Sequence, residues 1–444
     1  MGTRLLVVGG DAAGMSAALQ ARRLAPELEI VAVERGRWTS YSACGIPYLA
    51  GGTVTSVDSL VARTPDALRA QRIDVRTGHE VVALDLAARR AEVHNLTHGR
   101  SFQLGFDLLL LATGARPRRP EIDGADLPHV HGVQTLDDAA RLLDDAKRRR
   151  PATVAVIGGG YIGLEMAEAF RSRGAAVTVL EPGPEVLPAV DPDLGSRVAR
   201  AMRGMGIDVR IGVETQAIGE GVVATSTGDV PAELVVLGTG VVPNSELGVD
   251  AGLETGARRA LVVDRRQRTG REGVWAAGDC CQSVHRVSLR PVYQPLGTVA
   301  NKQGRVAGIN MAGGYATFPG VLGTAVTRVC DLEVGRTGLG EAEAGEAGFE
   351  AVVVTVESTT TAGYLPESRP VTVKMLAERR TGRLLGMQCA GGPGSAKRVD
   401  VVAAALAGGL TVEDLIGLDL SYAPPFSPVW DPLQTAARNL LSSL

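Results

Sequence analysis

A glycine-rich pattern near the start of the chain constrains its fold more than any other feature. An apolar run at 4–8 is followed by the residues GGDAAG at 9–14, by a helix that we expect over 15–24, and by a second apolar run ending in Glu34. Glu34 stands 20 residues after Gly14. A strand, a glycine turn, a helix and a strand ending in an acid form the dinucleotide-binding βαβ unit. The pattern departs from that unit at Asp11, which replaces the middle glycine.

The same pattern returns later in the chain without that departure. An apolar run at 153–157 leads into GGGYIG at 158–163, a helix expected over 164–173 and a run ending in Glu181. Glycines let the backbone approach a pyrophosphate, whose charge is stabilised at a helix N-terminus. One such pattern is weak evidence, but two in the same context predict two dinucleotide sites. Glu181 would repel a 2′-phosphate, which favours NADH over NADPH at the second site while leaving NADPH possible.

Composition and charge exclude several classes of protein. The chain has 444 residues, which is too long for one ordinary domain and suggests about three. The net charge of -3 and a single basic block at 147–150, expected at an exposed helix end, argue against nucleic-acid or anionic-membrane partners. The apolar runs fall far short of the roughly 20 residues that a membrane helix needs. Since no leader-like segment precedes the run at 4–8, we expect a cytoplasmic protein.

The cysteines are Cys44, Cys280, Cys281, Cys330 and Cys389. Their spacing matches neither a disulfide framework nor a zinc site, so we expect reduced thiols and no bound metal. Cys280 and Cys281 are adjacent, and because a disulfide between neighbours is strained we expect them to pack as small apolar residues. Cys44 follows the first glycine pattern, and Pro47 suits the first turn of a helix. A thiol at a helix N-terminus is expected to favour the thiolate, the form that attacks disulfides.

The last third of the chain has a different sequence pattern, without a glycine-rich dinucleotide pattern. Strand-like runs at 325–329, 351–357 and 371–376 alternate with loops and precede a helix expected over 399–407. The proline-rich stretch at 422–432 cannot be a regular helix or a central strand, so we expect a fixed loop that presents aromatic side chains. This part is predicted to form a third, α+β domain.

These segments together resemble the FAD-dependent pyridine nucleotide-disulfide oxidoreductases. Within that family they resemble the single-cysteine branch, and within that branch the coenzyme A disulfide reductases. The resemblance covers essentially the whole chain and rests on both glycine patterns, SYSACG at 40–45, ATG at 112–114, GTG at 238–240, AGD at 277–279 and YAPPF at 422–426. The implied fold is α/β, with two Rossmann-like dinucleotide-binding domains and a C-terminal α+β dimerisation domain. The implied boundaries are an FAD-binding domain at 1–115 and 243–320, an NAD(P)H-binding domain at 116–242 and a dimerisation domain at 321–444.

The resemblance also implies where the cofactors bind. FAD would occupy the first site, with Glu34 on its adenosine ribose and Asp279 on its ribityl chain, and NADH would occupy the second. The cofactor-binding candidates are Gly9, Gly10, Ala13, Gly14, Glu34, Arg35, Val81, Thr113, Gly114, Gly158, Gly160, Tyr161, Ile162, Gly163, Glu165, Glu181, Gly240, Gly278, Asp279, Gly297 and Thr298.

The chemistry implied by the resemblance centres on Cys44. Its thiolate would attack coenzyme A disulfide and hold one coenzyme A as a mixed disulfide, which electrons from NADH would release through FAD. The protein would be a homodimer with shared active sites, in which Tyr422 and Tyr364 reach the partner's thiol; either could instead be a structural tyrosine with a satisfied hydroxyl. The substrate-binding candidates are Ser16, Gln20, Arg23, Ser40, Ser42, Arg72 and Asn301. Ser16, Gln20 and Arg23 share one face of the first helix, which could equally be a solvated face.

Three alternatives stay open. An NADH oxidase or peroxidase would cycle Cys44 through a sulfenic acid, but such relatives usually carry a histidine where this chain has Ala12. A persulfide or polysulfide reductase shares nearly all the motifs and often carries an added rhodanese domain. A redox-sensing flavoprotein without disulfide turnover is the third, and the thiol and tyrosine loop argue against it.

Overall fold

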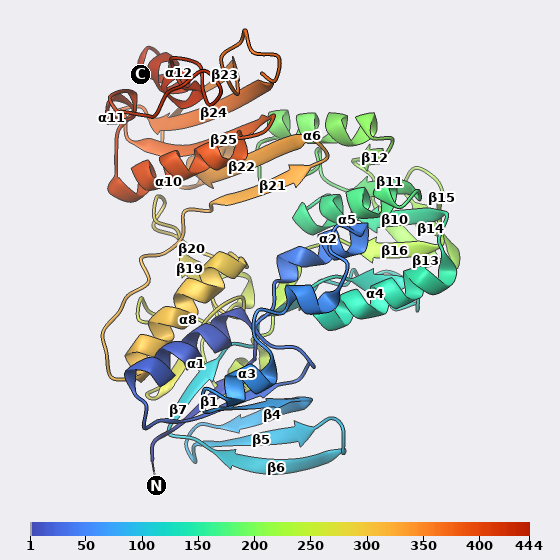
Figure 1. The fold of residues 1–444 in the computed structure, drawn as a ribbon, viewed down its shortest axis with the longest axis vertical. Helices are drawn as coiled ribbons and strands as arrows, with labels where there is room; N and C mark the ends of the chain where they lie inside the picture. Colours follow the sequence, from blue (N-terminus) through green and yellow to red (C-terminus); the bar gives the residue numbers. More distant parts are fainter. Residues whose placement is uncertain (1) are drawn as a thin grey trace.

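The structure, a computed structural model, describes residues 2–444. Figure 1 shows a first unit at the N-terminal end, a second unit beside it and a C-terminal sheet at the opposite end of the long axis. Within the described residues, no helix combines the length and the apolar character needed to cross a membrane.

The first unit is built on a parallel five-stranded sheet. Its strands, in order across the sheet, are β18 (Val274–Ala276), β7 (Leu108–Leu111), β1 (Arg4–Val8), β2 (Glu29–Glu34) and β3 (Ile73–Thr77). Because successive side chains of a strand point to opposite faces, Leu5 and Val7 pack on helices while Leu6 and Val8 pack on a second, antiparallel sheet. The helices are α1 (Ala12–Leu24) and α8 (Gly297–Met311), and the antiparallel strands are β4 (His79–Asp85), β5 (Arg90–Asn95) and β6 (Arg100–Gly105).

The second unit repeats this plan. Its parallel sheet has the order β12 (Asp208–Ile211), β11 (Ala176–Glu181), β10 (Thr153–Ile157), β16 (Leu234–Leu237) and β9 (Val130–Gly132). Helices α4 (Leu136–Arg149), α5 (Tyr161–Ser172) and α6 (Pro192–Gly204) share a core with Val154 and Val156. The opposite face, with Ala155 and Ile157, packs on β13 (Thr215–Gly219), β14 (Gly221–Thr225) and β15 (Val230–Ala232). The chain enters and leaves this unit through β8 (Ala115–Pro117) and β17 (Val241–Pro243), which pair antiparallel.

The C-terminal unit is an antiparallel sheet with helices. The strand order is β21 (Ala325–Val329), β22 (Leu332–Gly338), β25 (Leu384–Gly391), β24 (Pro370–Glu378) and β23 (Ala351–Thr359). Its helices are α9 (Glu341–Glu346), α10 (Val399–Gly408), α11 (Val412–Ile416) and α12 (Pro432–Leu441). The remaining short elements are η1 (Ala43–Gly45), α2 (Ile46–Gly51), η2 (Val57–Leu60), α3 (Pro65–Arg69), α7 (Glu246–Asp250), η3 (Ala257–Arg259), β19 (Ser283–Val284), β20 (Pro291–Val292) and η4 (Ala396–Arg398).

The expected elements are largely present, with two differences. Helices α1 and α5 begin at Ala12 and Tyr161, three residues earlier than predicted, because the last glycine of each pattern lies inside the first helical turn. In the C-terminal unit, β22 and β25 were not predicted. β25 is buried along its whole length, so it lacks the alternation that reveals a strand.

A buried lysine joins the second unit to the C-terminal unit. Lys374 on β24 is only 4% exposed, and its ammonium group contacts Asp191 (3.0 Å) and Asp193 (2.8 Å) at the start of α6. It also contacts Glu341 on α9. Burial lowers the pKa of Lys374, but the hydrogen bonds to Asp193, Glu341 and Asp191 outweigh burial and raise it overall. The lysine is therefore charged and holds three carboxylates together.

We predict that Lys374→Met lowers the free energy of unfolding by about 1–3 kcal/mol, because three carboxylates lose their shared cation. Asp193 and Glu341 are about half exposed, so water limits the loss. Urea unfolding measures it. The matched control is Lys397→Met, whose ammonium is 77% exposed and pairs only with Asp400, so its effect should stay below about 1 kcal/mol. Equal losses in both variants would contradict a special role for Lys374.

Candidate functional site

One cavity of about 2490 Å³ lies where the three units meet. Its wall contains both glycine loops, the segment around Cys44, the start of α8 and part of β21. The two dinucleotide patterns therefore open into the same space, which the sequence alone does not establish.

The first glycine loop is fixed by a carboxylate that accepts hydrogen bonds from two backbone N–H groups. Glu34, at the end of β2, accepts hydrogen bonds from the Gly10 N–H (2.7 Å) and the Gly36 N–H (2.6 Å). Gly9 has a φ of +113°, and a Cβ there would lie 2.1 Å from the carbonyl oxygen of Ala112, so no other residue fits. Burial raises the pKa of Glu34, although the two N–H groups oppose that effect.

The second loop uses the same arrangement. Glu181, at the end of β11, accepts from the Gly159 N–H and the Gly183 N–H, each at 2.7 Å. Gly158 has a φ of +101°, and a Cβ there would lie 2.5 Å from the carbonyl oxygen of Gly238. Both loops thus present backbone at the end of a strand beside an ordered carboxylate, which fits the binding of two dinucleotides.

Most cofactor-binding candidates line this cavity. Gly14 and Gly163 do not; each packs against the carbonyl oxygen of its own loop's first glycine, which a Cβ would approach to 2.0 and 2.1 Å. The candidates in the wall are Gly9, Gly10, Ala13, Glu34, Arg35, Val81, Thr113, Gly114, Gly158, Gly160, Tyr161, Ile162, Glu165, Glu181, Gly240, Gly278, Asp279, Gly297 and Thr298. Burial raises the pKa of Asp279 to about 6.

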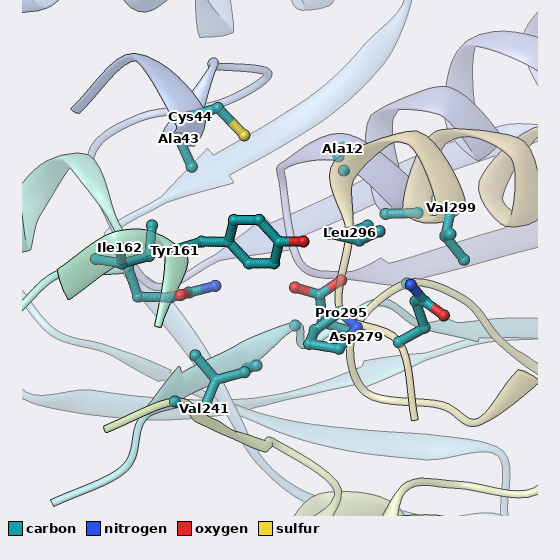
Figure 2. A pocket seen from close by; sticks show the side chains of 18 of the residues that line it. Ala12, Ala43, Cys44, Tyr161, Ile162, Val241, Asp279, Pro295, Leu296 and Val299 are labelled. Atoms are coloured by element: carbon teal, nitrogen blue, oxygen red, sulfur yellow. The ribbon is translucent and has the colours of Figure 1, made fainter. Parts of the chain in front are cut away.

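Cys44 lies in the short turn η1, immediately before α2. Its side chain is exposed at the cavity wall, and Figure 2 shows the sulfur pointing into the cavity, with the ring of Tyr161 and the carboxylate of Asp279 directed into the same space. Burial first and the Glu165 carboxylate second raise the pKa of the Cys44 thiol. The predicted position at a helix start is correct. Burial and the nearby carboxylates act against the predicted preference for the thiolate, because both raise the pKa.

The C-terminal unit of the same chain reaches this site through Glu165 on α5. The Thr327 hydroxyl on β21 donates to Glu165 Oε1 at 2.9 Å. Burial raises the pKa of Glu165, and the bond from Thr327 opposes it. Sequence reasoning missed Thr327, because nothing in the local pattern of β21 links it to a residue 162 positions earlier.

The substrate-binding candidates are only partly brought together. Ser42 and Asn301 line the cavity, whereas Ser16, Gln20, Arg23, Ser40 and Arg72 lie outside its wall. The Ser16 hydroxyl donates to Asn301 Oδ1 at 2.7 Å and so joins α1 to α8. Arg23 donates to Gln20 Oε1 at 3.1 Å, as neighbours on one helix face do. At Arg72, the backbone carbonyl accepts from the Arg22 guanidinium at 2.6 Å.

The two tyrosine candidates lie on exposed loops of the C-terminal unit. Tyr364 is 76% exposed and Tyr422 is 49% exposed, and neither lines the cavity. The Ala362 N–H donates to the Pro424 carbonyl at 2.9 Å, which holds the two loops together. Figure 1 places the turn between β23 and β24 at the outer end of the C-terminal sheet, away from α2. Within one chain these tyrosines are therefore not part of the Cys44 site.

Comparisons with known proteins assign the family. A family model described as pyridine nucleotide-disulphide oxidoreductase matches residues 3–304, and the model of its dimerisation domain matches residues 324–433. The chain belongs to the pyridine nucleotide-disulphide oxidoreductases. It is thus an FAD-dependent NAD(P)H oxidoreductase with a C-terminal dimerisation domain, as its motifs predicted.

Three relatives show how varied the named activities are. The chain is 37% identical to the NAD(P)H coenzyme A polysulfide/persulfide reductase of Pyrococcus horikoshii, with 99% of each chain covered. It is 34% identical to a Methanocaldococcus jannaschii protein named NADH oxidase, again with 99% of each covered. The structure of reduced Bacillus anthracis CoADR-RHD superposes with a TM-score of 0.97 at 33% identity, covering 100% of this chain and 81% of that one.

We predict that Glu165→Gln shifts the alkylation profile of Cys44 to lower pH. The raised thiol pKa falls when the nearby negative charge is removed, so more thiolate is present at a given pH. Iodoacetamide labelling across pH, resolved by peptide mass spectrometry in one fixed cofactor state, measures this.

The control lies on the same helix. Burial first and Glu168 second raise the pKa of Cys330 to about 11. Glu168→Gln should therefore shift the profile of Cys330 and leave that of Cys44 in place. Equal shifts of Cys44 in both variants would contradict a specific effect of Glu165.

Proposed function

We propose that this protein uses NADH to reduce a sulfur–sulfur bond of a coenzyme A compound through Cys44. The observation that carries the proposal is the position of one thiol in the cavity shared by both glycine loops. Among the described residues, no other cysteine lines that cavity, and Cys280, Cys281 and Cys389 are buried. A single thiol has no partner for an internal disulfide, so the second sulfur comes from the substrate.

The residues of this chain take defined parts in the reaction. The Cys44 thiolate attacks one sulfur of coenzyme A disulfide, the sulfur–sulfur bond breaks, and one coenzyme A leaves as a thiolate that takes up a proton. When bound, FAD supplies the two electrons, taken from NADH, that reopen the Cys44–coenzyme A disulfide and restore the thiolate. The balance is one NADH and one proton consumed for two coenzyme A thiols formed.

The pKa of Cys44 determines how much of its thiol is in the thiolate form that attacks the substrate. Burial first and the Glu165 carboxylate second raise this pKa, which disfavours the thiolate that attacks the disulfide. Glu165 lines the same cavity and has a raised pKa of its own, so we propose it as the group that exchanges a proton with the thiol.

Coenzyme A disulfide is the first substrate to test, and a coenzyme A persulfide is the second. The persulfide is favoured by the 37% identical Pyrococcus relative, whose name includes coenzyme A persulfide. Both substrates require the same attack by Cys44 on a sulfur–sulfur bond. Glu181 beside the second loop supports NADH as the donor, since its carboxylate would repel a 2′-phosphate.

The dimerisation domain supports a homodimer with shared sites. Exposed Tyr422 and Tyr364 would then face the partner's Cys44 and donate a proton or hydrogen bond to the departing thiolate. We also propose that segments 1–115 and 243–320 act as one FAD-binding unit, since β18 extends the sheet formed by β1, β2, β3 and β7, with 116–242 as the NADH unit and 321–444 as the dimerisation unit.

We predict rapid anaerobic NADH oxidation with coenzyme A disulfide, and at least a hundredfold loss in Cys44→Ser, because removing a nucleophile costs orders of magnitude. Absorbance at 340 nm and release of free thiol measure it. Activity with coenzyme A persulfide but not the disulfide would move the assignment to the second substrate. NADH consumption with oxygen alone, unchanged in Cys44→Ser, would contradict the proposal.

We predict that Tyr422→Phe lowers turnover about tenfold through loss of a proton or hydrogen-bond donor. Mixed dimers of a Cys44→Ser subunit with a Tyr422→Phe subunit should exceed both parent homodimers, because one shared site then has both native residues. The control is Tyr315→Phe, because Tyr315 is also an exposed tyrosine, at 76%, but lies outside these loops. Mixed dimers no more active than the mean of the two parents would show that each site uses its own chain's tyrosine.

A further inference from the structure

The two glycine loops differ at one position, and the fold does not require that difference. Asp11 precedes α1 with φ −107° and ψ −152°, and its counterpart Gly160 precedes α5 with φ −78° and ψ −179°. Both are extended conformations that any residue adopts. A Cβ at Gly160 would lie 3.6 Å from the nearest backbone atom, which is ordinary contact. Since neither backbone conformation requires a glycine, the side chain of Asp11 needs another explanation.

The Asp11 side chain bonds to the segment that carries the thiol. Asp11 stands at the N-cap position of α1, yet its side chain makes no standard N-cap hydrogen bond. Its Oδ1 instead accepts a hydrogen bond from the Tyr41 N–H at 3.0 Å. The preceding amide, of Ser40, donates to the Gly10 carbonyl at 3.0 Å. Two successive amides of the thiol segment are thus bonded to two successive residues of the first glycine loop.

The segment needs such bonds because its own backbone is strained. Ser40 has a φ of +48°, a left-handed conformation that is unfavourable for a residue with a Cβ. On its other side the segment is held by the Ser42 N–H to the Leu60 carbonyl and the Ala62 N–H to the Ser40 carbonyl, each at 2.8 Å. The Gly45 N–H then closes the turn around Cys44 onto the Ser42 carbonyl at 2.9 Å.

We propose that Asp11 is a positioning residue that fixes the Cys44 segment onto the first glycine loop. The expected effect on turnover rests on the proposed role of Cys44. The hydrogen bond between Asp11 and the Tyr41 amide does not depend on which substrate the protein uses. Asp11 acts through the Tyr41 amide, and the bond spans from the loop that would approach FAD to the residues that aim the thiol into the cavity.

The bond needs an acceptor oxygen and not a charge. Burial raises the pKa of Asp11 to about 7, with the Tyr41 N–H opposing the rise and Glu34 and Asp279 adding to it. A neutral carboxyl retains its carbonyl oxygen as an acceptor, and so does an asparagine side chain. The proposal therefore separates Asp11→Asn, which keeps an acceptor, from Asp11→Ala, which removes it while suiting the extended backbone.

The test uses full-length, FAD-loaded protein and amide hydrogen exchange of the peptide that contains residues 38–46. We expect exchange in Asp11→Ala to be about fivefold faster than in the wild type, since a lost hydrogen bond of this kind contributes about 1 kcal/mol. Asp11→Asn should stay within about twofold. The peptide containing Gly158 to Glu165 serves as an internal reference that should not change in either variant.

Two further measurements, FAD content and turnover, distinguish a positioning role of Asp11 from a role in binding FAD or in folding. FAD content, measured by absorbance, should be retained in both variants, because neither removes a backbone group of the loop. Turnover with coenzyme A disulfide should fall about tenfold in Asp11→Ala and recover in Asp11→Asn, while NADH reduction of the bound flavin stays unchanged. Unchanged exchange in Asp11→Ala, or equal damage in both variants, would overturn the proposal. If the protein does not turn over disulfides, Asp11→Ala should still speed amide exchange in residues 38–46. Failure of the proposed function can therefore be told apart from failure of the positioning proposal.

Discussion

The site depends on a carboxylate that accepts two backbone hydrogen bonds at the end of a parallel strand. Glu34 does this for the first loop and Glu181 for the second, with all four distances between 2.6 and 2.7 Å. Each carboxylate fixes a loop whose first glycine touches the backbone of a neighbouring strand's end. Because the two units share this construction and meet at one cavity, both loops face the same space, and the Cys44 thiol lines that space.

The pKa of the thiol is governed by its surroundings. Burial raises the pKa of Cys44 most, and the Glu165, Asp279 and Asp11 carboxylates add to the rise. α2 has only six residues. Because the thiolate is the reactive form, these surroundings restrain the reactivity of Cys44, and Glu165 is the carboxylate that contributes most to the restraint.

A structural feature of this protein can be predicted from the sequence when it depends on residues that are close together in the chain. The strands at 4–8 and 153–157 and both glycine turns follow from residues within 30 positions of one another, and all are present. β25 escaped prediction because a strand buried on both faces has no period of two. Thr327 on Glu165 and the Asp11–Tyr41 bond escaped for a different reason: each joins elements that only the folded chain brings together. Among the substrate candidates, helical periodicity put Ser16, Gln20 and Arg23 on one face of the first helix but could not decide which side chains enter the cavity. Ser16 instead bonds to Asn301 on α8.

The C-terminal unit contributes to the site by holding the second unit in place. Lys374 binds the start of α6, and the Asp191 N–H donates to Gln388 Oε1 on β25 at 2.7 Å. Thr327 binds Glu165, and the Glu168 carboxylate accepts from the Cys330 N–H at 2.8 Å. One set of these contacts is made with α6 and the other with α5, and both helices pack under the second glycine loop. The Thr327 hydroxyl therefore fixes Glu165, a carboxylate that raises the pKa of the Cys44 thiol, to β21 of the C-terminal unit.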